Sequence, residues 1–197
     1  MIIAGLTGSI GMGKTTTAAM FKDAGAAVFD ADAAVHSLYA KGGAVVPIVR
    51  AGLPQAITAG AVDRTKLSAI IAKDPLQLTV LESFVHPMVD AMRQDAVSAA
   101  KASGKKVFIF DMPILFETDG EDKVDVIIVV SAPADVQRAR VMSRAGMTAE
   151  KLEFILSRQM PDAEKRARAD YVINSGKGME FARKQVQVVM QDLKNRA

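Results

Sequence analysis

The most constraining feature of the sequence is a glycine-rich segment close to its start. Residues Gly8 to Thr15 read GSIGMGKT and match the pattern G-x-x-x-x-G-K-[ST] at every fixed position. Such glycines let backbone N–H groups turn toward phosphate oxygens, and the positive end of the following helix faces the same anion. The apolar run Ile2–Leu6 precedes the segment, and a helix is expected to begin near Lys14. The pattern predicts a phosphate-binding loop (P-loop) for a nucleotide. The alternative is a glycine-rich turn without a ligand.

Three side chains at the end of this loop have expected contacts. Lys14 should reach the β- and γ-phosphates, and the Thr15 hydroxyl should bind Mg²⁺. Thr16 is a candidate for the α-phosphate.

Short apolar runs alternate with longer helical segments along the chain. The runs are Ile2–Leu6, Ala27–Phe29, Val107–Phe110, Val126–Val130 and Tyr171–Ile173, and helices are expected at about 14–24, 33–40, 64–72, 75–102, 134–145, 148–159 and 178–195. Runs that are apolar throughout are typical of parallel strands covered on both faces. The alternation indicates right-handed βαβ units, so the predicted fold class is α/β with a doubly wound sheet.

The spacing of the strands is uneven and predicts two insertions into a single domain over residues 1–197. The core is expected at about 1–32, 105–137 and 169–197. A helical insertion at about 33–104 is suited to binding a second substrate, and an Arg- and Lys-rich segment at about 138–168 is expected to form a lid. Within the first insertion, Pro87 is expected to break or kink the helix, so that its second half begins afresh there.

Composition excludes several classes of protein. The net charge of +3 is modest and mixed in sign, which argues against a dedicated nucleic-acid binder. The chain has no Cys, so it has neither a disulfide framework nor a thiolate metal site. No apolar run approaches the roughly 20 residues that a membrane span needs. No secretory leader is recognisable, and we expect a cytoplasmic protein, monomeric or weakly self-associating.

Carboxylates follow two of the predicted strands, at the edge of the sheet where ligands bind in such folds. Asp32, after Ala27–Phe29, could accept the proton of an attacking hydroxyl, or it could simply cap the next helix. Asp30 is expected to be structural or a supporting partner. Asp111, after Val107–Phe110, stands where a carboxylate commonly orients Mg²⁺ or its waters.

Basic residues of the predicted lid are candidates for phosphate contacts. Arg140 and Arg144 are four residues apart and therefore share one helix face. Guanidinium groups bind phosphates bidentately and stabilise charge on a transferring phosphoryl group. For Arg138, Lys151 and Arg158 a solvated basic surface is the favoured interpretation.

Several nucleotide-binding classes compete at this point. A regulatory GTPase would need the guanine-reading N-K-x-D, which the chain lacks. A motor or assembly ATPase, another small-molecule or nucleotide kinase, and a binding module without catalysis remain as alternatives, and the short basic lid favours a kinase.

Further motifs resemble the dephospho-coenzyme A kinases along nearly the whole chain. Their order and spacing carry the resemblance: the P-loop, Asp30–Asp32, Asp63-Arg64 with Leu67, His86-Pro87, Asp111–Glu117, the Arg140/Arg144 pair, Gln159-Met160 with Lys165, and Ala169–Asn174. Ser9, Met12 and Thr15 depart from common family residues without loss of the loop's chemistry. Ala69-Ile70-Ile71 lacks an aromatic often found there.

The resemblance implies a P-loop kinase fold with a five-stranded parallel sheet, a helical substrate domain and a lid. It implies ATP-dependent phosphorylation of the ribose 3′-hydroxyl of dephospho-coenzyme A, the last step of coenzyme A synthesis, with ATP and Mg²⁺ as cofactors. The implied catalytic residues are Asp32 as base, Lys14 and Arg140. The implied ATP-binding residues are Gly8, Gly11, Met12, Gly13, Lys14, Thr15, Thr16, Arg144 and Asn174; the implied acceptor-binding residues are Asp32, His86, Asp111 and Leu115; Thr15 and, as a second candidate, Asp111 would contact the metal.

Overall fold

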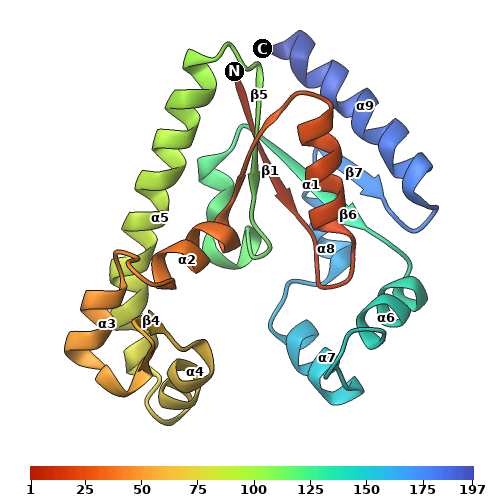
Figure 1. The fold of residues 1–197 in the computed structure, drawn as a ribbon. Coiled ribbons are helices and arrows are strands. Elements are labelled where there is room, and N and C mark those ends of the chain that lie inside the picture. Colours follow the sequence, from red (N-terminus) through yellow and green to blue (C-terminus); the bar gives the residue numbers. More distant parts are fainter. The chain divides into compact units, whose positions relative to one another are not determined.

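The central strand of the fold is β1 (Ile2–Thr7), which leads into the P-loop. It pairs in parallel with β5 (Val107–Asp111) on one side and β6 (Val126–Ser131) on the other. β2 (Ala27–Asp30) neighbours β5, and β7 (Tyr171–Asn174) pairs with β6, giving the order β2-β5-β1-β6-β7 (Figure 1). The structure is a computed structural model and describes all residues, 1–197. The predicted five-stranded parallel sheet is confirmed.

Each strand of this sheet extends one residue beyond its predicted end. The added residues are all polar: Thr7, Asp30, Asp111, Ser131 and Asn174. The prediction ended each strand at its last apolar residue. In the structure the strand continues for one further residue, which is polar. The carboxyl ends of the strands are therefore lined by hydroxyl, carboxylate and amide groups.

Nine α-helices, three 3₁₀ turns and one hairpin complete the chain. The α-helices are α1 (Lys14–Asp23), α2 (Ala31–Tyr39), α3 (Val46–Gly52), α4 (Arg64–Lys73), α5 (Leu76–Ala102), α6 (Ala134–Met142), α7 (Ala149–Ser157), α8 (Asp162–Ala167) and α9 (Met179–Arg196); the 3₁₀ turns are η1 (Pro54–Ala56), η2 (Phe116–Thr118) and η3 (Gly120–Lys123); the hairpin joins β3 (Ile57–Thr58) to β4 (Ala61–Val62). The seven predicted helices are confirmed. The short α3 and α8 and the hairpin were missed, because elements of two to seven residues show too little periodicity.

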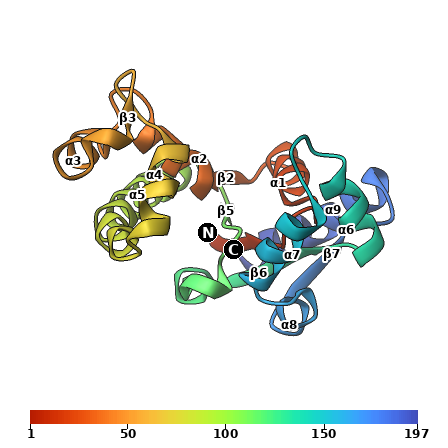
Figure 2. The same cartoon turned by 90° about the horizontal axis from the view of Figure 1, so that it is seen from below.

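Successive side chains of β6 pack into two different apolar clusters, one on each face of the sheet. Ile128 and Val130 pack in the larger cluster, together with buried side chains of α1 and α9. Val129 points the other way and packs with Leu115 and Phe116. Because successive side chains of a strand face opposite sides, the sheet is covered on both faces, by α1 and α9 on one and by α8 on the other (Figures 1 and 2).

Helix α5 runs without a break through Pro87, so the prediction of a restart there is wrong. Proline lacks the N–H that would bond to the Ser83 carbonyl, one turn earlier. Ser83 and Pro87 are both exposed, so water can satisfy the freed carbonyl. Leu81 and Val85 are buried on the opposite side of the same helix and hold its turns together through apolar packing.

The chain forms two compact units. The larger unit comprises residues 1–29 and 99–197, and the smaller unit comprises residues 30–98. The smaller unit has its own apolar core, which includes Leu38, Val49 and Leu67. The insertion at 33–104 and the lid at 138–168 stay predictions as functional divisions, and the lid residues belong to the larger unit.

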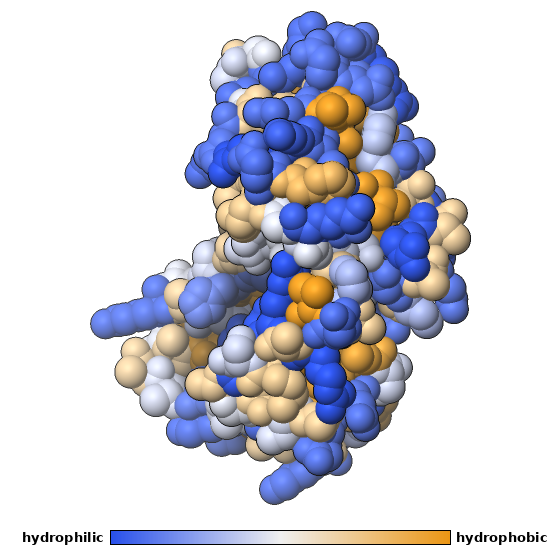
Figure 3. All heavy atoms as spheres, turned by 90° about the vertical axis from the view of Figure 1, so that its right-hand side faces the viewer, coloured by the Kyte–Doolittle hydropathy of each residue, from blue (hydrophilic) through white to orange (hydrophobic).

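The surface is predominantly polar where α6, α7 and α9 are exposed. Figure 3 shows hydrophilic side chains over this face, with apolar atoms in small separate groups. Phe154 and Val188 are among the exposed apolar residues. None of the helices combines the length and the apolar character required to span a membrane.

Candidate active site

The P-loop connects the end of β1 to the start of α1 through residues that only glycine suits. Gly11 and Gly13 have φ angles of 78° and 90°, in the left-handed region. A Cβ on Gly11 would lie 2.5 Å from Val141 Cγ2, well inside contact distance. Gly13 directly precedes α1, so the free N–H groups of the helix's first turn are directed at the loop. The local backbone therefore has the form that a bound phosphate requires.

Lys14 meets a carboxylate at the end of the neighbouring strand. Its Nζ lies 2.5 Å from Oδ1 of Asp111, and the two side chains are 14% and 3% exposed. The register of β1 and β5 favours this contact, because Asp111 stands beside Leu6, just before the P-loop begins. The carboxylate holds the lysine ammonium beside the loop. A bound phosphate could contact the same ammonium there.

Thr15 and Asp111 fit a magnesium ion by their chemistry. A hydroxyl and a carboxylate are hard oxygen donors of the kind that Mg²⁺ takes beside nucleotide phosphates. Thr15 is exposed, and no cluster of three or more His, Cys, Asp and Glu residues forms a metal site anywhere in the chain. These two residues would therefore hold the ion together with phosphate oxygens and waters.

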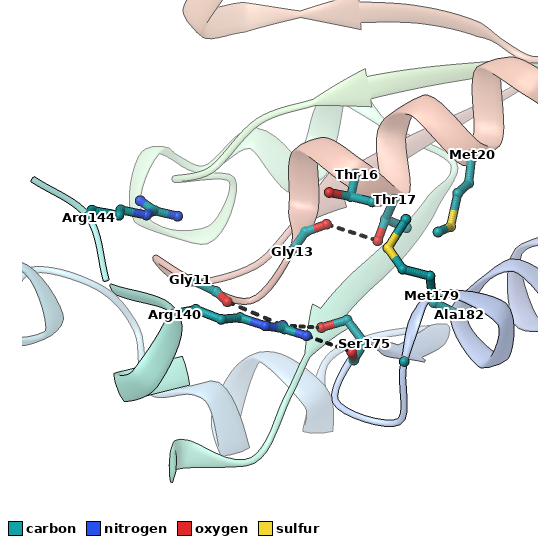
Figure 4. Close-up of a pocket in the computed structure, with 11 residues that line it drawn as sticks. Gly11, Gly13, Thr16, Thr17, Met20, Arg140, Arg144, Ser175, Met179 and Ala182 are labelled. Atoms are coloured by element: carbon teal, nitrogen blue, oxygen red, sulfur yellow. Dashed lines mark hydrogen bonds between the residues drawn. The ribbon is translucent and has the colours of Figure 1, made fainter. Parts of the chain in front are cut away.

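A cavity of about 350 Å³ opens beside the P-loop, entirely within the larger unit. Its lining comes from the loop and α1 (Gly11, Gly13, Thr16, Thr17, Met20), from the predicted lid (Arg140, Arg144) and from the segment after β7 (Ser175, Gly178, Met179, Ala182) (Figure 4). The structure thus brings both predicted arginines to the predicted phosphate loop. It also adds the segment after β7, which the sequence analysis did not single out.

Arg140 is held in place by the segment that follows β7. Its two guanidinium nitrogens donate to Ser175 Oγ at 2.9 Å and to the Ser175 carbonyl at 2.8 Å, as Figure 4 shows. Ser175 Oγ in turn donates to the Met12 carbonyl at 2.6 Å. A weaker contact of 3.4 Å joins Arg140 to the Gly11 carbonyl. Arg140 therefore connects the P-loop, α6 and the β7–α9 segment.

Arg144 and Asn174 are placed differently from Arg140. Arg144 is exposed, and Figure 4 shows its side chain apart from the Arg140–Ser175 contacts. Asn174 Oδ1 accepts from the Gly176 N–H at 2.9 Å and so shapes the turn that presents Ser175. Asn174 lines a second cavity of about 500 Å³ rather than the cavity beside Gly11.

The segment after Asp111 is anchored by buried groups. The Leu115 side chain is fully buried in an apolar cluster, so it offers a substrate no exposed surface. Glu117 Oε1 lies 2.9 Å from Nζ of Lys165, which is completely buried, and accepts the Met160 N–H at 2.7 Å. Its other oxygen, Oε2, has no hydrogen-bond partner in the protein. This ion pair links the residues that follow β5 to α8.

Asp32 and His86, the candidates for the acceptor, belong to the smaller unit. Asp30 caps α2, because its side chain accepts the Ala33 N–H at 3.0 Å. The structure therefore rules out the reading of Asp32 as the helix cap. Asp32 lies exposed in the first turn of α2, and His86 is exposed on α5.

The chain has relatives among known families, curated sequences and solved structures. A family model described as dephospho-CoA kinase matches residues 2–180. The chain belongs to the dephospho-CoA kinase family. Two curated relatives named dephospho-CoA kinase, from Mesorhizobium japonicum and Agrobacterium fabrum, are 47% and 48% identical over 98% of this chain and 98% of their own.

Solved structures agree with this assignment of the fold. TT1252 from Thermus thermophilus superposes with a TM-score of 0.84 at 31% identity, covering 98% of this chain and 97% of its own. A dephospho-CoA kinase from Campylobacter jejuni superposes with a TM-score of 0.72 at 22% identity, covering 98% of each chain. A shikimate kinase from Bacteroides thetaiotaomicron superposes with a TM-score of 0.55 at 16% identity, also covering 98% of each chain. These two structures support the fold alone. The predicted family, P-loop kinase fold and kinase class are confirmed, and family membership implies the use of ATP.

Proposed function

We propose that this dephospho-CoA kinase transfers the γ-phosphoryl group of ATP to the ribose 3′-hydroxyl of dephospho-coenzyme A. The observation that carries the proposal is the Lys14–Asp111 pair at the ends of β1 and β5, within a P-loop that matches its pattern throughout. Family membership over residues 2–180 supports the choice of acceptor.

Positioning and electrostatics would supply most of the rate enhancement, because phosphoryl transfer leaves little covalent work for a protein. Lys14 would neutralise charge on the β- and γ-phosphates, and the N–H groups from Gly11 to Thr16 would hold the phosphate chain. Arg140, fixed by Ser175, would face the nucleotide from the lid side. Mg²⁺, held by Thr15 with Asp111 as a second ligand, would offset the negative charge that develops on transfer.

Asp32 is our candidate for the base that orients and deprotonates the acceptor hydroxyl. It is a free carboxylate in the first turn of α2, whereas the neighbouring Asp30 is occupied as the helix cap. His86, also in the smaller unit, would contribute to the acceptor pocket. General-base catalysis of this kind is typically worth about 10²–10⁴-fold in rate.

The acceptor is tested by ADP release with purified protein, ATP and Mg²⁺. Dephospho-coenzyme A should stimulate release strongly, whereas AMP, CMP and shikimate should not. Stimulation by another acceptor in place of dephospho-coenzyme A would refute the proposed substrate, and acceptor-independent ADP release alone would indicate an ATPase.

The base is tested by comparing Asp32→Asn with Asp30→Asn. Both changes remove one carboxylate at nearly the same place, and Asn retains helix-capping ability at position 30. Asp32→Asn should lower kcat at least 100-fold, and Asp30→Asn should leave it near the wild-type value. Near-wild-type turnover by Asp32→Asn would refute the assignment.

The metal and the cellular setting belong to the same proposal. Thr15→Val should raise the Mg²⁺ concentration needed for half-maximal activity, whereas Thr15→Ser should not. The reaction would take place in the cytoplasm on a small-molecule acceptor, without nucleic acid or membrane partners. Size-exclusion chromatography with light scattering tests the expected monomer or weak homo-oligomer.

A further inference from the structure

Two glutamine side chains hold the same residue of the P-loop from opposite sides. Gln137 Nε2 donates to the Ile10 carbonyl at 2.7 Å. The Ile10 N–H donates to Gln159 Oε1 at 3.1 Å. Both backbone groups of Ile10 are thus satisfied by side chains that lie 127 and 149 residues away along the chain.

Ile10 lies at the bend of the loop, where the orientation of one peptide plane matters. The Met12 N–H donates to the Ser9 carbonyl at 3.1 Å, which closes a turn with Ile10 and Gly11 as its central residues. The φ of 78° at Gly11 is the value that a type II turn has at its third residue. Types I and II differ mainly by a flip of this central peptide.

The central peptide carries the Ile10 carbonyl and the Gly11 N–H, which point in opposite directions because the trans peptide is planar. Gln137, by holding the carbonyl, therefore sets the direction of the Gly11 N–H. Gly11 lines the cavity beside the loop, and no protein group accepts its N–H. A phosphate oxygen is the acceptor that such a loop offers this group.

The two glutamines also come from two places in the α6–α7 region: Gln137 directly precedes the predicted lid at about 138–168, and Gln159 lies within it. Gln137 lies in α6 and is 7% exposed, and Gln159 follows the end of α7. One helical turn after Gln137, Arg140 approaches the carbonyl of the next loop residue, Gly11. Two consecutive carbonyls of the P-loop thus receive donors from one face of α6.

We propose that Gln137 and Gln159 are positioning residues that hold the Ile10–Gly11 peptide in its nucleotide-binding orientation and tie the P-loop to α6 and to the segment that follows α7. The proposal rests on ATP as the phosphoryl donor in the proposed function, but not on the identity of the acceptor. Nucleotide affinity measured without an acceptor therefore separates the two.

The test uses isothermal titration calorimetry with ATP and Mg²⁺ on two methionine variants, two glutamate variants and one control variant. Gln137→Met and Gln159→Met keep the side-chain length and remove the hydrogen bond. Each should raise the Kd for ATP about 3- to 10-fold, the equivalent of one lost hydrogen bond. Gln191→Met is the matched control, because Gln191 also loses a side-chain hydrogen bond, the one that its Nε2 donates to Asn195 Oδ1 at 2.9 Å within α9, on a residue that does not contact the P-loop. It should leave the Kd within about 2-fold.

Substitution by glutamate distinguishes positioning from mere loss of packing. Gln159 acts as an acceptor, so Gln159→Glu keeps its bond to the Ile10 N–H. Gln137 acts as a donor, so Gln137→Glu sets a carboxylate against the Ile10 carbonyl. Both variants add the same charge beside the same residue, so their difference reports the hydrogen bonds. Gln137→Glu should weaken ATP binding at least about 10-fold more than Gln159→Glu.

Equal Kd values for the two glutamate variants would overturn the proposal, as would wild-type ATP affinity in both methionine variants. If a Gln137 variant does not fold, Gln159→Met and Gln159→Glu still decide when they are compared at high salt, which screens the added charge, since only Gln159→Met should then lose affinity. A wild-type protein that binds ATP but does not phosphorylate dephospho-coenzyme A would refute the proposed function alone.

Discussion

Removing one partner of the buried Lys165–Glu117 pair should destabilise the larger unit strongly, and removing both charges should cost much less. The two charged atoms are 2.9 Å apart, with side chains 0% and 17% exposed. At an effective dielectric constant of about 20, charges at this separation attract by about 6 kcal/mol, which offsets the cost of desolvating them. A single substitution removes the attraction and leaves the other charge buried.

The expected loss in free energy of unfolding depends on which charged group remains buried after the substitution. Lys165→Met leaves the Glu117 carboxylate, one of whose oxygens already lacks a partner, and should cost about 3–5 kcal/mol. Glu117→Gln should cost a similar amount, because it leaves a fully buried ammonium. The double variant removes both charges, and its glutamine oxygen still accepts the Met160 N–H. It should be less destabilised than either single variant, with a coupling energy of at least about 3 kcal/mol.

The assay is urea unfolding followed by circular dichroism at 222 nm, because the chain has no Trp. Thermal unfolding gives a second measure. For a chain of this size a loss of 1 kcal/mol in the free energy of unfolding lowers the melting temperature by roughly 2–4 °C, so Lys165→Met should melt about 6–20 °C below the wild type. If the two units unfold in separate steps, hydrogen exchange in β5 and β6 identifies the step to compare. Additive losses in the double variant would refute the charge-pair argument.

Three further outcomes are expected from single residues. Gly11→Ala places a Cβ 2.5 Å from Val141 Cγ2 at a φ of 78°, so ATP affinity measured by calorimetry should fall at least about 10-fold; unchanged affinity would contradict the described loop. Arg140→Ala should raise the KM for ATP and lower kcat, and steady-state kinetics that match the wild type would remove Arg140 from the site. The Lys66 N–H and, to a smaller extent, the Thr58 hydroxyl lower the pKa of Asp63, the cap of α4, below 3.8. The stabilisation from this cap is therefore complete above pH 3.8 and disappears as the pH falls through the lowered pKa. The difference in free energy of unfolding between wild type and Asp63→Ala, measured in urea, should therefore shrink from pH 7 to pH 3. A difference that stays constant would contradict this.

Local patterns predicted the fold well because the sheet is buried on both faces. Runs such as Val126–Val130 within β6 are apolar throughout, and a run of that kind has few other places to lie in an α/β fold. The P-loop was equally predictable, since its glycines and Lys14 act through the local backbone. The prediction of a helix break at Pro87 was wrong, because apolar packing along the rest of α5 overrides the tendency of proline to end a helix.

The parts of the site that the sequence did not predict depend on contacts between distant segments. Gln137 and Gln159 reach Ile10 across more than 120 residues, and no spacing rule marks a glutamine that bonds to a backbone group. Ser175 was missed for the same reason, although it directly follows β7. Asp32 could be separated from Asp30 only when the cap of α2 was located.

The strand order has a consequence for synthesis of the chain. β1 and β2 are made first, yet the sheet neighbours of β1 are β5 and β6, and β2 adjoins β5. No two adjacent strands of the five-stranded sheet are therefore available until residues 107–111 have left the ribosome. Residues 30–98, with their own apolar core, are complete before that point. The helical unit is thus expected to collapse first during translation, while the P-loop waits for the second half of the chain to give it a sheet.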